Sequence, residues 1–505
     1  MTIYYLLDAA VSEKEQGIKL TFFSPSKNKW KEILDTGYRP YFFIQYPIPE
    51  DDLKVIQELG LGISVVEKTD LFTRKTVKLT RIDMNDFSDP LQLSRNFSKS
   101  WEKEVHVVSS YMYDNNLVFG AQYKIKGKEI VPLLGVSKKD LKTFKKAFSE
   151  IRKTDPEKYK LSKRLFILCS QPVPEVSLKR FGIRKKVDSE ELYLMFMLAR
   201  LTNLPVPKAF RNRQVSTWIK SILHNYLRKN NILIPTSKEL RRGEKTHSVK
   251  GALTLTPEPG VHFNTVVVDF DSMYPSLIDS YNLSHETIDC ADDDCQSNKV
   301  PELDHYVCTK RRGVYSILIG SLKDLRIHWF KPRSKDKALS DEKRSLAEAT
   351  SQLLKLILVS SYGVVIRIHG LSRSSLGESI TAYGRYSLRT AKLLSFLGFK
   401  PTEVRKNIEK AYLFRNKVSH GMPISKKEAG TIEELKTILD YLRLSLIIFI
   451  SLSKIKKNEF VHLVDSALID INSSLKLNNE LQEISERIPN IKHIFKNRSL
   501  AHAEQ

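Results

Sequence analysis

The order of apolar and polar positions divides the chain into regions of different character. Residues 1–130 alternate short β-rich runs such as "YRPYFFIQY" and "HVVSSYMY" with turn-forming residues, which predicts a mixed α/β domain dominated by sheet. Residues 131–245 carry apolar residues at helical spacing, as in "SEELYLMFMLARLTNLP" and "QVSTWIKSILHNYLRKNNILIP", and proline closes both segments. The pattern is helical again over 340–400 and over 401–505.

One apolar run ends in two carboxylates, in "VVVDFDSMYPS", residues 266–276. The run fits a strand buried on both faces, and Asp269 stands where the strand stops before the chain turns at Pro275. Mg²⁺ needs oxygen ligands and is usually held by one or two carboxylates plus substrate phosphates. Asp before a turn is also common for capping, so this residue alone fits either a metal ligand or a local cap.

The charge balance predicts a polyanionic partner. The 505 residues include 82 Lys and Arg against 58 Asp and Glu, a formal net charge of +24. Nucleic acid is the expected partner because such an excess favours phosphate binding, and a membrane surface is the weaker alternative. The start "MTIYYLLDAA" has no basic segment before a long apolar core, and the run Leu444 to Leu452 is too short to cross a bilayer. We therefore expect an intracellular, cytoplasmic protein.

Three of the four cysteines lie together in "CADDDCQSNKVPELDHYVC", residues 290–308. Four cysteines in so long a chain do not indicate a disulfide framework. Cys290, Cys295, His305 and Cys308 offer four ligands for a tetrahedral zinc ion, although the first gap is long and the histidine spacing is irregular. Unliganded thiols are the alternative.

The order of motifs resembles that of family B DNA polymerases of the archaeal type. "DFDSMYPS" is similar to motif A, D-x-x-S-L-Y-P-S, and "KLILVSSYG", residues 355–363, is similar to motif B, K-x-x-x-N-S-x-Y-G, with Val359 in place of Asn. "ESITAYGR", residues 378–385, resembles the helix that follows motif B. Val249 stands where the family has the Tyr of its Y-x-G-G/A element, and the resemblance covers residues 1–400.

The resemblance implies nucleotidyl transfer to a primer 3′-hydroxyl, with two Mg²⁺ or Mn²⁺ ions, a DNA primer-template and deoxynucleoside triphosphates. Asp269 would be the catalytic metal ligand, whereas Asp271 occupies a variable position and is expected to act locally. Tyr274 would lie beneath the sugar and reject a 2′-hydroxyl, and Arg326 and Lys355 would donate to the triphosphate. The nucleotide-binding set implied by the resemblance is Ser272, Tyr274, Arg326, Lys355, Tyr362 and Gly363.

Two departures from the family pattern change the expected activity. The acidic motifs of a proofreading exonuclease are not found between residues 80 and 200, so we expect no proofreading. After Lys400 the family continues into Y-G-D-T-D-S, motif C, but this chain reads "PTEVRKNIEK", and the thumb is also missing. Asp465 and Asp470 lie in a helix-like pattern and are not expected to replace motif C. The metal centre is therefore expected to be incomplete and turnover weak, unless a second polypeptide supplies motif C.

The last hundred residues have a different resemblance. "IEKAYLFRNKVSHGMPIS" is similar to the R-x4-H segment of HEPN domains, with Arg415 and His420 in the motif positions. In active members of that group, Arg and His cut RNA without metal. The alternative is a helical bundle in which these two residues are incidental. The amphipathic segment "IEELKTILDYLRLSLIIFI" suits a homodimer contact, and the junction near residue 400 fits either a natural fusion or a disrupted gene.

These observations predict an α+β multidomain fold. We expect the following regions: an N-terminal mixed α/β domain at 1–130, a degenerate exonuclease-like and helical region at 131–245, palm and fingers at 246–400, and an all-α HEPN-like domain at 401–505. The expected function is that of a family B type DNA polymerase without proofreading. A non-catalytic DNA-binding protein derived from a polymerase, and a HEPN-type metal-independent ribonuclease, are the alternatives.

Overall fold

The computed structural model describes most of the first 396 residues. The described ranges are 2–12, 14–104, 117–133, 135–183, 187–211, 214–241, 251–254, 269–367 and 372–396. The chain divides into two compact units, Met1–Gly251 with Asp269–Ala382, and Ala252–Val268 with Tyr383–Gln505. The features discussed below lie in the first unit, except that its last helix continues through residues 383–396 of the second. Several sequence predictions fall outside the described residues: the strand before Asp269, Val249, Leu444, Leu452, Asp465, Asp470, Arg415, His420 and the domain at 401–505.

The N-terminal sheet has five antiparallel strands in the order β3-β2-β1-β7-β8. Tyr5 on β1 lies opposite Phe23 on β2, and Leu6 lies opposite Phe22, so apolar side chains pair across the two central strands. The strands are β1 (Ile3–Ser12), β2 (Gly17–Ser24), β3 (Lys29–Asp35), β7 (Gln122–Lys126) and β8 (Glu129–Leu133). The predicted sheet-rich start of the chain is confirmed in this respect.

A second sheet of three antiparallel strands has the order β4-β6-β5. Strand β4 is apolar on both faces because both faces are covered: Phe42 and Ile44 belong to one core cluster, and Tyr41 and Phe43 belong to another. Ile56 of α1 packs in the first cluster. The elements are β4 (Tyr41–Gln45), α1 (Glu50–Glu58), β5 (Gly62–Thr69), β6 (Thr76–Asp83) and α2 (Pro90–Ser94).

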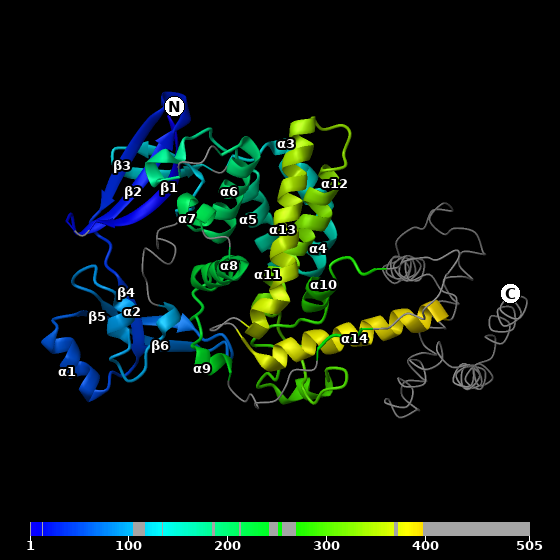
Figure 1. Ribbon diagram of the computed structural model, residues 1–505. Helices are drawn as coiled ribbons and strands as arrows, with labels where there is room; N and C mark the ends of the chain where they lie inside the picture. Colours follow the sequence, from blue (N-terminus) through cyan, green and yellow to red (C-terminus); the bar gives the residue numbers. More distant parts are fainter. Residues whose placement is uncertain are drawn as a thin grey trace, which may run out of the picture. The chain divides into compact units, whose positions relative to one another are not determined.

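Helices make up the rest of the described unit (Figure 1). They are α3 (Lys138–Ala147), α4 (Ser149–Thr154), α5 (Pro156–Cys169), α6 (Ser189–Thr202), α7 (Val206–Arg211), α8 (Val215–Lys229), α9 (Ser237–Leu240), α10 (Met273–Ser280), α11 (Val314–Leu325), α12 (Lys331–Arg333), α13 (Asp341–Arg367) and α14 (Ser374–Phe396). A π-helix, Arg326–Phe330, joins α11 to α12. Helix α11 packs against α5, α10 and α13 and is therefore the centre of this helical region.

Helix starts follow sequence signals. The Asp155 side chain accepts a hydrogen bond from the Lys158 amide and Pro156 follows it, so α5 begins with an N-cap and an N1 proline. Asp188 caps α6 in the same way, through the Glu191 amide. Helix α6 confirms the helical reading of "SEELYLMFMLARLTNLP", residues 189–205.

One described helix is long and apolar enough to cross a membrane, by length and composition alone. It is the stretch Asp341–Ile366 of α13, and half of its most apolar window is buried within the protein. Helix α13 packs against α6, α8, α10 and α11. The core helix of a protein can be as long and as apolar as a membrane-spanning helix. The apolar composition of α13 is accounted for by its packing against these four helices.

Helices α5, α10 and α11 are joined by buried charges. Asp279 of α10, whose side chain is 6% exposed, lies 3.0 Å from Nζ of Lys158 and 2.7 Å from Nζ of Lys323. Nη2 of Arg312 donates to Asp279 Oδ1 at 2.8 Å. Burial would raise the pKa of Asp279, but Lys323 and Lys158 outweigh it and hold the pKa below its usual value of 3.8. Gly320 permits this packing, since a Cβ there would meet Asp279 Oδ1 at 2.5 Å.

We predict that Asp279→Asn lowers the free energy of unfolding by about 3–5 kcal/mol, because removing one partner leaves buried positive charge uncompensated. Urea unfolding of the variant and the wild type measures this difference. The folded pKa lies below the unfolded one, so the stabilisation is present above pH 3.8 and is lost as the pH falls through the folded pKa. The stability gap between the two proteins should therefore narrow below pH 3.8.

Asp51→Asn is the matched control. Asp51 pairs with Lys54 at 3.5 Å on the surface of α1, where its side chain is 95% exposed. An exposed pair of this kind contributes little, so no measurable change is expected. Equal effects of the two substitutions would contradict the assignment of the Asp279 contacts as a buried, stabilising network.

Candidate active site

The start of α10 is a strained turn. Its N-cap, Ser272, has φ 57° and ψ 50°, the left-handed region, which costs a non-glycine residue about 1–2 kcal/mol. The Ser272 carbonyl accepts the Ser276 amide at 3.0 Å. Strain of this kind persists only where surrounding contacts impose it, and it is concentrated at functional sites. The groups that hold this turn are therefore candidates for a functional site.

Arg326 is the main group that holds the turn. It is 7% exposed, its Nη1 donates to Ser272 Oγ at 3.3 Å, and its Nε donates to the Ser351 carbonyl of α13 at 3.3 Å. Its Nη1 also lies 3.7 Å from Asp271 Oδ1. A single guanidinium thus connects the turn before α10, the π-helix and α13.

The π-helix is anchored by aromatic packing. The Trp329 ring lies 4.8 Å from Phe166 and 5.8 Å from Phe144, measured between ring centroids. π-Helical turns are rare and occur frequently at functional sites. Because Trp329 is fixed by α3 and α5, the position of Arg326 one turn earlier is fixed as well.

Asp271 does more than act locally. Its Oδ2 accepts from Lys331 Nζ at 2.8 Å, across 60 positions of sequence, so it ties the turn to the start of α12. The hydrogen bond from Lys331, supported by the charges of Lys331 and Arg326, holds the pKa of Asp271 below its usual range. The sequence reading missed this contact because nothing in the local pattern marks Lys331 as a partner.

Helix α13 brings motif B beside the turn. The Tyr362 ring lies 4.8 Å from the Tyr274 ring, with an angle of 39° between their planes. Lys355 and Val359, one helical turn apart on the same side of α13, are both exposed, and Val359 is 68% exposed. Helix α13 thus presents a cation and an apolar side chain beside two tyrosines.

Gly363 has no packing reason to be glycine. Among the described residues, no atom outside the local helix backbone lies within 4 Å of the position that a Cβ would occupy there. At Gly320 and Gly377, by contrast, the same added atom would meet Asp279 at 2.5 Å and Ile366 at 2.6 Å. Glycine inside a helix is unfavourable, so an open glycine favours close approach of a ligand.

Asp269 is exposed just before the turn. Its Oδ1 accepts the Phe270 amide at 2.8 Å, a local contact. Within the described residues, Asp269 does not belong to any group of three or more potential metal ligands. It can supply one carboxylate to a hard cation, but the described structure places no complete ligand set around it.

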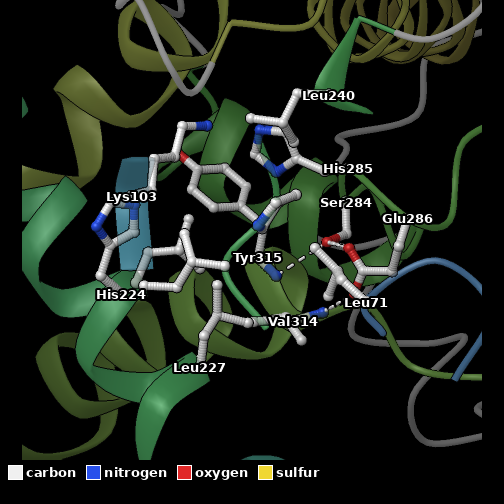
Figure 2. Close-up of a pocket in the computed structure, with 13 residues that line it drawn as sticks. Leu71, Lys103, His224, Leu227, Leu240, Ser284, His285, Glu286, Val314 and Tyr315 are labelled. Carbon is white, nitrogen blue, oxygen red and sulfur yellow. Dashed lines mark hydrogen bonds between the residues drawn. The ribbon is translucent and has the colours of Figure 1, made fainter. Parts of the chain in front are cut away.

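The first turn of α11 is capped from a distant loop. Ser284 Oγ accepts the Tyr315 amide at 2.9 Å, and Glu286 Oε1 accepts the Val314 amide at 2.5 Å, as Figure 2 shows. Gly313 allows the contact, since a Cβ there would meet the Ser284 Cβ at 2.3 Å. The hydroxyl of Tyr315 then donates to the Ser361 carbonyl at 2.8 Å, beside Tyr362. These caps were not predicted, because they join positions about thirty residues apart.

The cysteines come together with a different fourth partner from the one predicted. The ligand atoms of Cys290, Asp292, Cys295 and Cys308 all lie within 4.8 Å of one another. His305 is not in this group: its Nδ1 lies 2.7 Å from Asp289 Oδ2. That hydrogen bond, together with the charge of Asp289, raises the pKa of His305 despite its partial burial.

Comparison with known proteins accounts for the order of these motifs. Residues 204–410 match the sequence model described as DNA polymerase family B. This segment of the chain is therefore similar in sequence to DNA polymerase family B. The family resemblance drawn from the motifs is thereby confirmed, while the roles of individual residues stay predictions.

Several archaeal DNA polymerases are similar to part of this chain. DNA polymerase 1 of Sulfolobus acidocaldarius is 37% identical over 214 residues, which cover 39% of this chain and 24% of that protein. DNA polymerase 1 of Aeropyrum pernix is 34% identical over 212 residues, 39% of this chain and 21% of that protein. The matched segment therefore spans about a quarter of the length of these relatives.

The fold of a solved family B polymerase is similar. The structure of the enzyme from Pyrobaculum calidifontis superposes with a TM-score of 0.54 at 17% sequence identity, covering 78% of this chain and 72% of that chain. At this identity the likeness concerns the fold alone. It supports the mixed α/β, polymerase-like architecture but not the finer domain boundaries, which stay predictions.

Replacement of Gly320, Gly363 and Gly377 by alanine should separate a ligand-facing position from packed ones. Gly363→Ala should stabilise the folded state by about 0.5–1 kcal/mol, because alanine is the better helix former and has free space there. Gly320→Ala and Gly377→Ala should destabilise it by about 1–3 kcal/mol through overpacking. Thermal unfolding of the three variants measures the sign directly. Destabilisation by Gly363→Ala would show that its surroundings are filled.

Proposed function

We propose that this chain is a DNA-directed DNA polymerase of family B type that binds an incoming deoxynucleoside triphosphate and a primer-template at the α10–α13 site. The observation that carries the proposal is the contact of Tyr274 with Tyr362, beside the turn that Arg326 holds. Two residues that the motifs assign to one nucleotide site are therefore neighbours in space. Flat tyrosine rings suit the sugar and base of a nucleotide.

The charges of the site suit a triphosphate. Lys355 is exposed on the outer side of α13, where it can approach phosphate oxygens. Arg326 is mostly buried and bonded to Ser272 and Ser351, so its first role is to position the turn and α13. Positive charge at this place stabilises the negative charge that develops during phosphoryl transfer.

The proposed metal chemistry rests on Asp269. Mg²⁺ or Mn²⁺ would activate the primer hydroxyl and stabilise the leaving pyrophosphate, and an exposed carboxylate on a fixed turn is a suitable ligand. A two-metal centre needs a further carboxylate, and the chain reads "PTEVRKNIEK" where motif C would stand. We therefore propose that a second polypeptide completes the centre and that turnover by this chain alone is weak.

The other expectations stay predictions. The absence of proofreading rests on missing acidic motifs alone. The ribonuclease reading, with Arg415 and His420, and the homodimer through C-terminal helices concern residues outside the described part of the chain. A non-catalytic DNA-binding protein would share the nucleotide-site geometry, and only turnover separates it from a polymerase.

We predict that Lys355→Met weakens binding of a deoxynucleoside triphosphate to the chain–primer-template complex by about 10–150-fold, because it removes a charged contact worth about 1.5–3 kcal/mol. Equilibrium binding of a fluorescent nucleotide measures it. Lys343→Met is the matched control, because Lys343 is an exposed lysine in the first turn of the same helix. Equal loss of affinity in both variants would contradict a nucleotide site at Lys355.

Primer extension tests the proposed reaction. In Mg²⁺ and then Mn²⁺, wild-type chain should extend a primer slowly, and Asp269→Asn should abolish extension while binding of DNA is kept. Asp51→Asn is the control, since this exposed carboxylate belongs to α1 and pairs with Lys54 on the surface, so wild-type extension is expected. If the chain binds DNA and nucleotide but does not extend the primer in either metal, the non-catalytic alternative is favoured. Extension that appears when a partner carrying motif C is added would instead support the proposal.

A further inference from the structure

The segment between α10 and α11 has a core made of thiols. Residues 287–309, here called the cysteine loop, contain two isolated antiparallel bridges and the short 3₁₀ turn Asp293–Ser297. The buried cluster inside it consists of Cys290, Cys295 and Cys308, packed against Tyr306. Such a small loop-rich segment cannot be held by apolar burial alone, and structural metals commonly stabilise segments of this kind.

The distances within the cluster suit tetrahedral coordination. Cys295 Sγ lies 3.9 Å from Cys308 Sγ, and Cys308 Sγ lies 4.0 Å from Asp292 Oδ2. In a tetrahedral site with Zn–S bonds of about 2.3 Å, two sulfurs are separated by about 3.8 Å. The Cys295–Cys308 separation therefore matches one edge of such a site, and the four ligand atoms, all within 4.8 Å of one another, need to contract only slightly to close around an ion.

The surroundings support thiolate ligands. The Thr309 amide donates to Cys295 Sγ at 3.4 Å, and the Thr309 hydroxyl lies 3.5 Å from the same sulfur. Hydrogen bonds to ligand atoms orient them and tune metal binding. Lys310 lies 3.9 Å from Asp292 Oδ1 and would offset part of the negative charge of three thiolates and a carboxylate.

We propose that Cys290, Asp292, Cys295 and Cys308 bind one structural zinc ion. Three soft sulfur ligands and one oxygen select zinc over Mg²⁺ or Ca²⁺. The three cysteines are buried and four protein ligands close the coordination shell, so the site is structural rather than catalytic. His305 is not a ligand, since Asp289 holds it elsewhere.

The zinc ion would fix the connection between the two helices that carry the buried charge network. The Cys308 amide donates to the Thr287 carbonyl at 2.8 Å, closing the loop. Asn282, just after α10, donates to the carbonyls of Cys308 at 3.0 Å and Arg311 at 2.8 Å. Metal binding in the cysteine loop therefore stabilises the approach of α10 to α11. The proposal does not depend on polymerase activity.

Metal content and cobalt spectra test the site on the full chain. Protein made in zinc-supplemented medium and purified under reducing conditions should contain about one zinc ion per chain by elemental mass spectrometry. Co²⁺ added to the metal-free wild type should give thiolate charge-transfer bands and intense tetrahedral d–d bands, and this measurement needs no variant. Wild type that has reduced thiols but neither zinc nor a cobalt spectrum would overturn the proposal.

Variants identify the ligands. Asp292→Asn should weaken zinc binding by at least about tenfold, because loss of even an outer partner weakens metal sites by about 10–100-fold. Asp292→Cys should keep zinc with a four-sulfur cobalt spectrum. Cys169→Ala is the control, since Cys169 is the fourth cysteine and lies in α5, and should keep full zinc content. The ligand set would be refuted if His305→Ala lost zinc while Asp292→Asn kept wild-type zinc affinity. The zinc site itself would be refuted if protein purified without reductant or metal chelator contained a disulfide between Cys295 and Cys308.

Discussion

The geometry of the candidate site depends on the buried carboxylate of Asp279. Lys158, Lys323 and Arg312 come from separate parts of the chain, and all three lie within 3.0 Å of this one side chain. Buried charges left unpaired are strongly destabilising, so none of these elements can shift without a large free-energy penalty. The network need not add much net stability to have this effect, because it penalises other arrangements of α5, α10 and α11.

Helix α10 is held at both ends. Its last turn carries Asp279, and its N-cap, Ser272, is bonded to Arg326. Arg326 follows directly after α11, the same helix that carries Lys323 and Gly320. Because Tyr274 and Asp279 belong to the same eight-residue helix, the contacts that fix Asp279 also fix the position of Tyr274. The aromatic contact with Tyr362 is consequently fixed by contacts made well away from it.

The sequence predicted the parts of this arrangement that are local. Motif A and motif B could be recognised because their residues stand close together in the sequence, and residues 189–205 are predicted to be helical from their apolar spacing. The pairing of Lys158 with Asp279, across 121 positions, could not be predicted, because many lysines and aspartates are compatible with the same pattern. The fourth partner of the cysteines was misjudged for the same reason. Ligand type favoured His305 although its spacing was irregular, but the fold of the loop brings Asp292 to the sulfurs.

Several departures from ordinary structural rules lie near the N-terminal end of α10 and on α13. Ser272 is left-handed, Phe270 and Val359 are exposed apolar side chains, and Gly363 is a helical glycine with open space at its Cβ position among the described residues. Asp279, at the opposite end of α10, is buried and fully paired. Unfavourable local features of this kind lower the stability of the folded state, and proteins retain them mainly where function requires them. The N-terminal end of α10 and the facing side of α13 are therefore the surface that a ligand completes, and the C-terminal end of α10 is the support that holds it.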